Sequence, residues 1–333
     1  MYSSKITGLG CFVPENVVTN QELSELMETN DAWIQERTGI KERRWFTPGE
    51  HTVYGMGTEA AKMAIENAGL TSDDIDFIIF ATLSPDYQFP GPGVFVQREL
   101  GIKEIGALDV RNQCSCFVYG ISVADQFIKT GMYKNILVIG SEIQSSGMDK
   151  TTRGRGISVI FGDGAGAAVV SRTSEEGKGI LSTHLHSEGK HSDELMLKGP
   201  SSNSAVRMYK GITEDVDFIY PYMNGNAVFK HAVTRFMEVI GEALATNGYQ
   251  PSDINLLVPH QANIRITQYV GHKLGLGPDV AYSNIHKYGN TTAASIPLAL
   301  YDAWKEGKVN DGDLVCLAAF GSGFTWASAL IRW

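Results

Sequence analysis

Three continuous apolar runs indicate that the chain is a layered α/β protein. They occupy residues 77–83, 136–142 and 256–260. Such runs are typical of strands that are buried on both faces, because a strand with one solvated face alternates apolar and polar residues. Segments with helical spacing separate these runs along the chain. Strands that alternate with helices predict parallel pairing and a layered α/β fold.

A long-period repeat relates two parts of the chain. Residues 64–80 align with residues 243–259 at a shift of 179, and residues 107–131 align with residues 283–307 at a shift of 176. The first two segments lead from a helical pattern, through a glycine, into an apolar strand, and an apolar strand follows each of the second two. The repeat predicts two pseudo-symmetric halves that pack together, with any functional site at their shared seam.

A polar segment rich in Gly and Ser, residues 173–210, lies between the two repeats. Segments of this composition are typical of connections between structural units. We therefore predict an N-terminal half of residues 1–172 and a C-terminal half of residues 173–333.

Composition narrows the class of protein. An apolar content of 43% and a charged content of 20% fit an ordinary globular protein. The net charge of −9 argues against nucleic acid as a partner, because phosphate binding needs a basic surface. No stretch approaches about 18 apolar residues, so no membrane span is expected, and no secretory signal is visible at the N-terminus. The four cysteines include no C-x-x-C pair and no zinc spacing, which favours a reduced, cytoplasmic protein without a metal.

Cys114 is placed to begin a helix. Apolar residues follow it at positions 117, 121, 124 and 128, which predicts a helix that starts at about Cys114. The N–H groups and the dipole at a helix start stabilise a thiolate and lower the pKa of a thiol from about 8.5 to roughly 3.5–7.5. Cys114 is therefore a candidate nucleophile. The alternative is a small buried side chain without chemistry, as most cysteines are.

His260 and Asn290 are the other polar candidates. His260 ends an apolar run, at the strand edge where open α/β sheets hold their sites. The shift of 176 superimposes Asn290 on Cys114. In isolation, His260 also fits a hydrogen-bonded structural histidine, and Asn290 also fits a helix cap.

Two glycine-rich segments follow apolar runs. Residues 161–170 do not fit the spacing of a dinucleotide or phosphate loop, so we interpret them as a close-packed strand turn. Residues 319–326 lie just after the apolar segment that begins at residue 313, which is expected to form a strand. They either present backbone N–H donors to an oxyanion or form an ordinary turn.

Several motifs together resemble the β-ketoacyl-[acyl-carrier-protein] synthase III family of the thiolase-like superfamily. They are RNQCSCFVYG, VPHQANIRI, HKYGNTTAASIPLAL and AFGSGFTWASALIRW, with DAWIQERTGIKERR and FGDGAGAAVV matching as well. The resemblance spans nearly the whole chain, and the motifs occur in the family's order. It implies a thiolase-like α/β fold, a doubled five-layer αβαβα sandwich of two pseudo-symmetric halves, in agreement with the repeat.

The resemblance implies a reaction and a role for four residues. Cys114 would take an acyl group from acyl-CoA as a thioester, and His260 and Asn290 would donate hydrogen bonds to the malonyl thioester oxygen while CO2 leaves. Backbone N–H groups of Cys114 and Ser322 would form the oxyanion hole. The products would be a 3-oxoacyl-acyl carrier protein, CoA and CO2, without a metal or any cofactor besides the CoA thioester. Asn at position 290, where related enzymes of other branches carry His, favours the branch that initiates fatty acid synthesis.

The resemblance also implies contacts with substrates and partners. The positions that would bind CoA are Trp33, Arg37, Arg155 and Asn263, with Arg153 as the alternative to Arg155. The cations that would dock malonyl-acyl carrier protein, which is acidic, are Lys230, Arg265 and Lys273. Phe89 matches an aromatic residue that crosses a dimer seam and closes the partner's acyl pocket, which implies a homodimer.

Three departures from the family pattern leave a second function open. Cys116 and Ser322 each stand where the family usually has Gly, and the segment 173–210 is longer than usual. Because that segment lies near the acyl channel in relatives, the starter group is uncertain. The alternative is a specialised condensing or acyl-transferring enzyme of secondary metabolism that uses longer or branched acyl donors.

Overall fold

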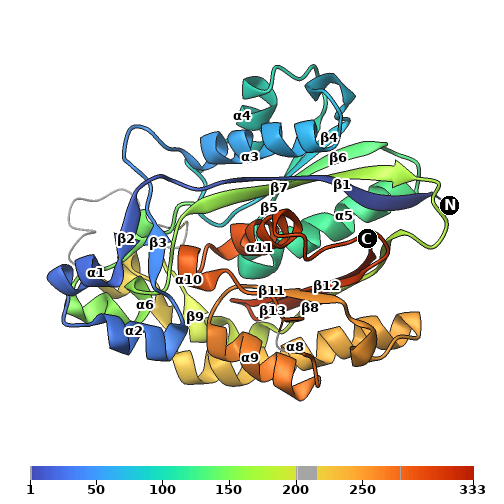
Figure 1. Cartoon of the computed structure of the whole chain (residues 1–333). Coiled ribbons are helices and arrows are strands. Elements are labelled where there is room, and N and C mark those ends of the chain that lie inside the picture. Colours follow the sequence, from blue (N-terminus) through green and yellow to red (C-terminus); the bar gives the residue numbers. More distant parts are fainter. Residues whose placement is uncertain (1, 200, 202–215, 278) are drawn as a thin grey trace.

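Five layers stack in the computed structural model, which describes residues 2–199, 201, 216–277 and 279–333. Outer helices cover a sheet, two helices form the central layer, and a second sheet is covered by further helices (Figure 1). The three apolar runs of the sequence form buried strands in these sheets. The doubled five-layer αβαβα sandwich is therefore confirmed.

The first sheet is mixed. In spatial order its strands are β1 (Ser3–Phe12), β7 (Gly164–Thr173), β6 (Asn135–Glu142), β4 (Phe77–Ala81) and β5 (Gly106–Val110). β4 is parallel to β5 and β6, as predicted, but β7 is antiparallel to both β1 and β6. The prediction of parallel pairing fails at β7 because only short helical turns connect it to β6, and a parallel crossover needs a full helix on the sheet.

The second sheet repeats this arrangement with four strands. They are β11 (Leu256–Pro259), β12 (Leu314–Gly321), β13 (Thr325–Arg332) and β8 (Gly179–Ser187). β11 and β12 are parallel, whereas β13 is antiparallel to β12 and β8. β8 lies inside the segment 173–210, so the expected linker in fact contains a sheet strand. The division at residue 172 stays a prediction, and β7 ends one residue beyond it.

Three layers of helices enclose and separate the sheets. They are α3 (Val53–Asn67) and α4 (Pro92–Glu99) on the first sheet, α5 (Cys116–Lys129) and α11 (Ser295–Lys305) in the centre, and α8 (Gly225–Asn247) and α9 (Ile264–Lys273) on the second sheet. α5 is apolar on most of its surface, which is typical of a helix that packs against a sheet on both sides. None of the described helices is both long and apolar enough to cross a membrane.

Shorter elements complete the described part of the chain. They are β2 (Val17–Thr19), α1 (Asn20–Leu26), α2 (Asp31–Thr38), β3 (Glu42–Arg44), α6 (Arg155–Ser158), β9 (Leu195–Met196), α7 (Val216–Ile219), β10 (Tyr222–Met223) and α10 (Ile285–Tyr288). Two 3-10 turns matter for the site, η2 (Gln113–Ser115) before α5 and η9 (Thr292–Ala294) before α11. Residues 161–170 run into β7 with their glycines closely packed, as predicted, but they continue as a strand rather than turn.

The repeat has a shift of 179 at the starts of the central helices and of the strands that follow them. β6 and β12 begin 179 residues apart, as do α5 and α11. α5 has 14 residues and α11 has 11, so the ends of these helices match at a shift of 176 instead. The predicted superposition of Asn290 on Cys114 is therefore wrong. Gln113 and Thr292, which share a positive φ of 48° and 52°, occupy the same position, and Cys114 corresponds to Ala293.

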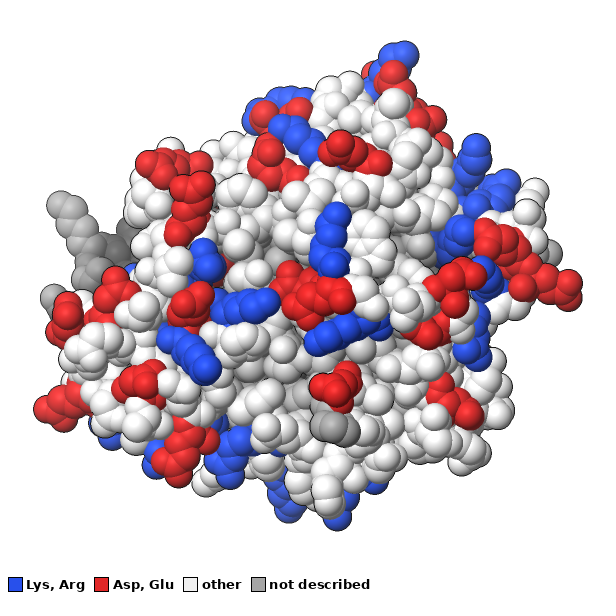
Figure 2. Space-filling model, viewed as in Figure 1, with Lys and Arg blue, Asp and Glu red and all other residues white. Residues whose placement is uncertain are grey.

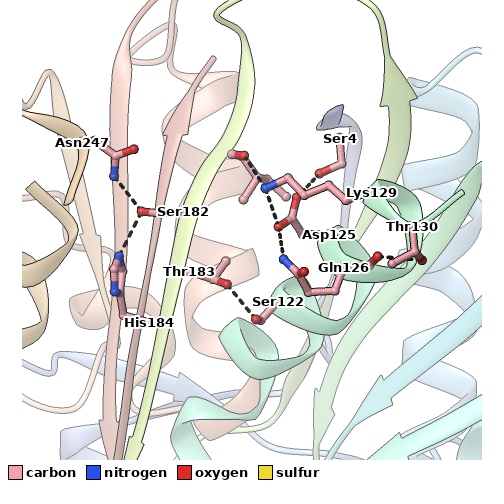
Figure 3. A network of polar contacts seen from close by, with 11 residues as sticks. Ser4, Ser122, Asp125, Gln126, Lys129, Thr130, Ser182, Thr183, His184 and Asn247 are labelled. Carbon is pink, nitrogen blue, oxygen red and sulfur yellow. Dashed lines mark hydrogen bonds and ion pairs between the residues drawn. The ribbon is translucent and has the colours of Figure 1, made fainter. Parts of the chain in front are cut away.

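A polar network ties α5 to both sheets at the seam (Figure 3). The carboxylate of Asp125, which is fully buried, accepts hydrogen bonds from Ser4 Oγ of β1 at 2.7 Å and from Lys129 Nζ at 2.8 Å. Ser122 Oγ lies 2.7 Å from Thr183 Oγ1 of β8. A buried carboxylate is costly without partners, so these contacts fix the central helix between the halves.

Candidate active site

Cys114 lies at the seam, in the η2 turn between β5 and α5. Its side chain is buried, with 8% of its surface exposed. Ser115 Oγ lies 2.6 Å from Thr325 Oγ1, so η2 is fastened to the start of β13 in the other half. The predicted helix start is confirmed, with the difference that the α-helix itself begins two residues after Cys114.

Gly321, the last residue of β12, packs directly against Cys114. A Cβ atom at position 321 would lie 2.9 Å from Cys114 Cβ and 3.0 Å from the backbone N of Cys114. Contacts this short do not occur between real side chains without a shift of the neighbour. The absence of a side chain at Gly321 is therefore what allows the two halves to close around the cysteine.

The thiol of Cys114 is protonated near neutral pH. Burial raises its pKa to about 12, and the nearby Glu142 carboxyl adds to the rise. Burial therefore opposes the thiolate that a helix start would stabilise. The physical reason is that Cys114 precedes the first α-helical turn and lies in a buried pocket that also contains an acidic group.

Glu142 is a buried acid that sequence reasoning missed. It ends β6 and accepts hydrogen bonds from Thr82 Oγ1 and Leu83 N, both at 3.1 Å, from Gln144 Nε2 at 3.0 Å and from Ser84 Oγ. Burial raises its pKa to about 7 in spite of these bonds. The available signal was a Glu at the end of a strand that is apolar throughout, NILVIGSE, because buried acids are rare without a role.

His260 follows β11 and is 2% exposed. Its backbone N–H donates to Ala318 O of β12 at 2.8 Å, and its Nδ1 lies 2.5 Å from Ser295 Oγ at the start of α11. Burial lowers the pKa of the imidazole to about 3. His260 is therefore neutral at physiological pH and carries one ring N–H, which can donate a hydrogen bond.

Asn290 is held by the first half of the chain. Its backbone N–H donates to Ile160 O at 2.9 Å, and its carbonyl accepts from Gly162 N at 3.0 Å. Its side-chain Oδ1 accepts a hydrogen bond from Thr292 N at 2.9 Å. This bond orients the amide so that Nδ2 is the end that can donate to a ligand.

The segments that carry these three side chains meet at one place. The η2 turn, which holds Cys114, packs against η9 and against the end of β12. Asn290 immediately precedes η9, and Ser295, which immediately follows it, contacts His260. A buried thiol, a neutral imidazole and a carboxamide thus lie on adjoining segments, a set that suits nucleophilic attack and stabilisation of a developing oxyanion.

Ser322 directly follows the glycine that packs on Cys114. Its hydroxyl donates to Leu195 O of β9, and its backbone carbonyl accepts from Thr325 Oγ1 at 3.2 Å. The side chain of Ser322 therefore points toward β9, whereas its backbone carbonyl is held by Thr325 at the start of β13.

Two arginines enclose Trp33 on α2. The guanidinium of Arg37 lies 4.6 Å from the ring centroid, and that of Arg155 lies 5.3 Å from it. Asn263 Nδ2 donates to Arg37 O at 2.8 Å and so joins the same group. Arg153 instead forms an ion pair with Asp149 at 2.6 Å. The structure groups Arg155, rather than Arg153, with Trp33.

A cavity of about 1030 Å³ adjoins this group. Arg153, Gly154 and Gly156 contribute to its wall, as do Asp193 and Met196 from the segment 173–210, whereas Arg155 is not among the residues that line it. Residues 200 and 202–210 of that segment lie outside the described residues, and the expectation that it is longer than in relatives stays a prediction.

The remaining predicted residues lie on the surface. Lys230, Arg265 and Lys273 are exposed on α8 and α9. Figure 2 shows that several Lys and Arg side chains lie along the lower edge of the molecule. Phe89 is 85% exposed in the loop before α4. Within the described part of the chain, no group of three or more His, Cys, Asp or Glu side chains is placed to hold a metal ion.

Comparisons with known proteins agree over the full length. The family model described as 3-oxoacyl-[acyl-carrier-protein (ACP)] synthase III matches residues 108–189, and the model of its C-terminal part matches residues 244–333. A beta-ketoacyl-[acyl-carrier-protein] synthase III of Rhodospirillum centenum is 45% identical over 334 residues, which is 99% of each chain.

Solved structures give the same result. The 3-oxoacyl-[acyl-carrier-protein] synthase III of Aquifex aeolicus matches with a TM-score of 0.90 and 42% identity, over 99% of this chain and 100% of that one. The priming beta-ketosynthase of the R1128 polyketide pathway matches with a TM-score of 0.89 and 32% identity, over 99% and 96%.

The fold and the buried thiol define a thiolase-like condensing enzyme, an acyltransferase. With 45% identity over its full length, the chain belongs to the 3-oxoacyl-[acyl-carrier-protein] synthase III family.

The contact between Gly321 and Cys114 gives a first prediction. The substitution Gly321→Ala should push the η2 turn away and lower the rate of Cys114 acylation by about 100-fold, since small misplacements of reacting groups have effects of this size. Quenched reactions with acetyl-CoA, analysed by intact mass, measure the rate at which acetyl-enzyme forms. As the matched control, Gly241→Ala on α8 adds a methyl group that meets no atom within 4 Å, and it should keep full activity. Full activity of Gly321→Ala would contradict the assigned packing.

Proposed function

We propose that this enzyme performs a decarboxylating Claisen condensation that initiates fatty acid synthesis. The starter acyl-CoA, such as acetyl-CoA, and malonyl-acyl carrier protein would give 3-oxoacyl-acyl carrier protein, CoA and CO2. The observation that carries the proposal is the buried thiol of Cys114, whose turn packs against the segments that hold His260 and Asn290. Membership of the family over the full length supports the same reaction.

In the first half-reaction, Cys114 takes the acyl group. Its sulfur attacks the thioester carbonyl of acyl-CoA, the new carbon–sulfur bond forms, and the bond to the CoA sulfur breaks. The proton of the thiol leaves with CoA, so the products are acyl-Cys114 and free CoA thiol. Backbone N–H groups of Cys114 and Ser322 hold the oxyanion, a role for which placed donors are effective in a buried site.

In the second half-reaction, neutral donors stabilise negative charge. Loss of CO2 from the malonyl group places charge on the thioester oxygen, and His260 and Asn290 donate to that oxygen. One such donor is typically worth about 2.7–4 kcal/mol in the barrier. The carbanion then attacks the carbonyl carbon of acyl-Cys114, and the thiolate of Cys114 is released and reprotonated.

Acyl-CoA and the carrier protein bind at two separate sites, each of which contains cationic side chains. Trp33 and Arg37 contact the adenine and the phosphates of CoA, and Arg155, which lies over the Trp33 ring, closes over the adenine. Asn263 supports this group through the backbone of Arg37. The acidic carrier protein docks on Lys230, Arg265 and Lys273, which are exposed on the neighbouring helices α8 and α9.

The enzyme acts as a homodimer in the cytoplasm. β5 is the edge strand of the first sheet, and Leu108 on it is 37% exposed. Phe89 and Tyr87 in the loop before α4 are 85% and 52% exposed. An open strand edge beside exposed aromatic side chains fits a second copy of the same chain. The four unpaired cysteines suit a reducing compartment.

A specialised starter-unit synthase is the second candidate. Cys116 supports it as a departure from the family pattern beside the nucleophile, since its fully buried thiol lies 2.6 Å from Gln113 O and packs on Ala81 and Ala293 where the family usually has Gly. The likeness to a polyketide priming synthase points the same way. In this case longer or branched acyl-CoA donors would acylate Cys114 in preference to acetyl-CoA.

Because Cys114 and Asn290 act in different half-reactions, a second prediction follows. Asn290→Ala removes the amide donor without adding a charge, so decarboxylation of malonyl-acyl carrier protein should fall by about 100-fold or more. Acylation of Cys114 should be unchanged, because it precedes that step. Release of CO2 and the mass of the acyl-enzyme measure the two steps. Loss of both steps in a variant that melts at the wild-type temperature would contradict the assigned roles.

The two arginines of the TTRGRG segment give a third prediction. Arg155→Ala should raise KM for acetyl-CoA by about 10-fold, since a guanidinium placed over an aromatic ring is worth roughly 0.5–2 kcal/mol. Arg153→Ala is the matched control and should leave KM within twofold. Acetyl-pantetheine, which lacks the nucleotide, should show no difference between the variants. An effect of Arg153→Ala alone would reverse the assignment.

A further inference from the structure

His260 must present one particular ring nitrogen to the substrate. A neutral imidazole carries its proton on Nδ1 or on Nε2, and only the nitrogen with the proton can donate. Nδ1 is engaged by Ser295 Oγ at 2.5 Å, so Nε2 is the nitrogen left for the substrate. Both residues are buried, at 2% and 1% exposure, so bulk water does not determine the tautomer.

The hydrogen bonds around Ser295 decide which way its hydroxyl points. The backbone N–H of Gln261 donates to Ser295 Oγ over a long 3.4 Å, and an N–H group can only donate. If Nδ1 also donated, the hydroxyl would accept twice and its own proton would need a third partner. Within the described part of the chain, Ser295 Oγ has no side-chain hydrogen bond besides these two. A buried hydroxyl proton without an acceptor is costly, so the hydroxyl donates to Nδ1.

We propose that Ser295 is a positioning residue that holds His260 as the tautomer protonated on Nε2. The proposal rests on the proposed function, in which Nε2–H donates to the malonyl thioester oxygen. With the proton on Nδ1 instead, Nε2 would present a lone pair to the developing negative charge and would repel it. The substrate step that depends on Ser295 is therefore decarboxylation, and acylation of Cys114 does not depend on it.

The same short segment orients both donors. Thr292 N–H fixes the amide of Asn290, and three residues later Ser295 fixes the imidazole of His260. The positive φ of Thr292, 52°, lies between these two contacts and turns the chain from one to the other. Residues 290–295 thus orient both hydrogen-bond donors of the second half-reaction.

Three proteins test the proposal: the wild type, Ser295→Ala and Ser295→Thr. Ser295→Ala should lower kcat for decarboxylation at least roughly 10-fold, as the loss of a tautomer-fixing partner does in other enzymes, with KM for malonyl-acyl carrier protein within twofold. Acetylation of Cys114 should be unchanged. Ser295→Thr, which keeps a hydroxyl, should recover most of the rate.

The tautomer itself is read by nitrogen NMR of protein labelled with 15N-histidine, with His260→Ala to assign the signal. The wild type and Ser295→Thr should carry the proton on Nε2, and Ser295→Ala should lose this preference. A wild-type imidazole protonated on Nδ1, or a Ser295→Ala enzyme with unchanged rate and tautomer, would overturn the proposal. If Ser295→Ala does not fold, the wild-type spectrum still tests the proposal, because it shows which ring nitrogen of His260 carries the proton. Failure of the proposed function is a different result, namely wild-type protein that never becomes acylated on Cys114.

Discussion

The close packing of Gly321 against Cys114 is the constraint on which the site depends. It joins the end of β12 in one half to the η2 turn of the other, and a methyl group at position 321 would leave only 2.9 Å to Cys114 Cβ. The hydrogen bond between Ser115 and Thr325 and the polar network around Asp125 hold the same seam closed. The repeat thus has a structural consequence, because the buried thiol at the start of α5 meets segments at the start of α11 and the end of β12.

Burial sets the electrostatics of this seam. It raises the pKa of Cys114 and Glu142 and lowers that of His260, so each group favours its neutral form. A site of neutral groups suits a reaction in which negative charge develops only in the transition state. Hydrogen-bond donors in such a dry site stabilise that charge more strongly than they would in water, and they need no reorganisation at the moment of reaction.

Sequence patterns predicted the strands that are apolar throughout, the repeat and, through the family motifs, the positions of Cys114, His260 and Asn290. They missed the antiparallel strands β1, β7, β8 and β13, because small and polar residues within these strands hide their burial. They also misplaced Asn290, since α11 is three residues shorter than α5 and the missing residues cannot be located from few identities. The thiol pKa, Glu142 and Ser295 depend on three-dimensional proximity, which no local pattern records.

Acetylation of the enzyme across pH tests the central claim most directly. The wild type is mixed with acetyl-CoA between pH 6 and 9, and intact mass with peptide mapping follows the acetyl group over time. A buried thiol with a raised pKa predicts acetyl only on Cys114, with a loading rate that rises about tenfold per pH unit as the thiolate fraction grows. Acetyl on another residue, acetylation that persists in Cys114→Ala, or a rate that is independent of pH would contradict the account.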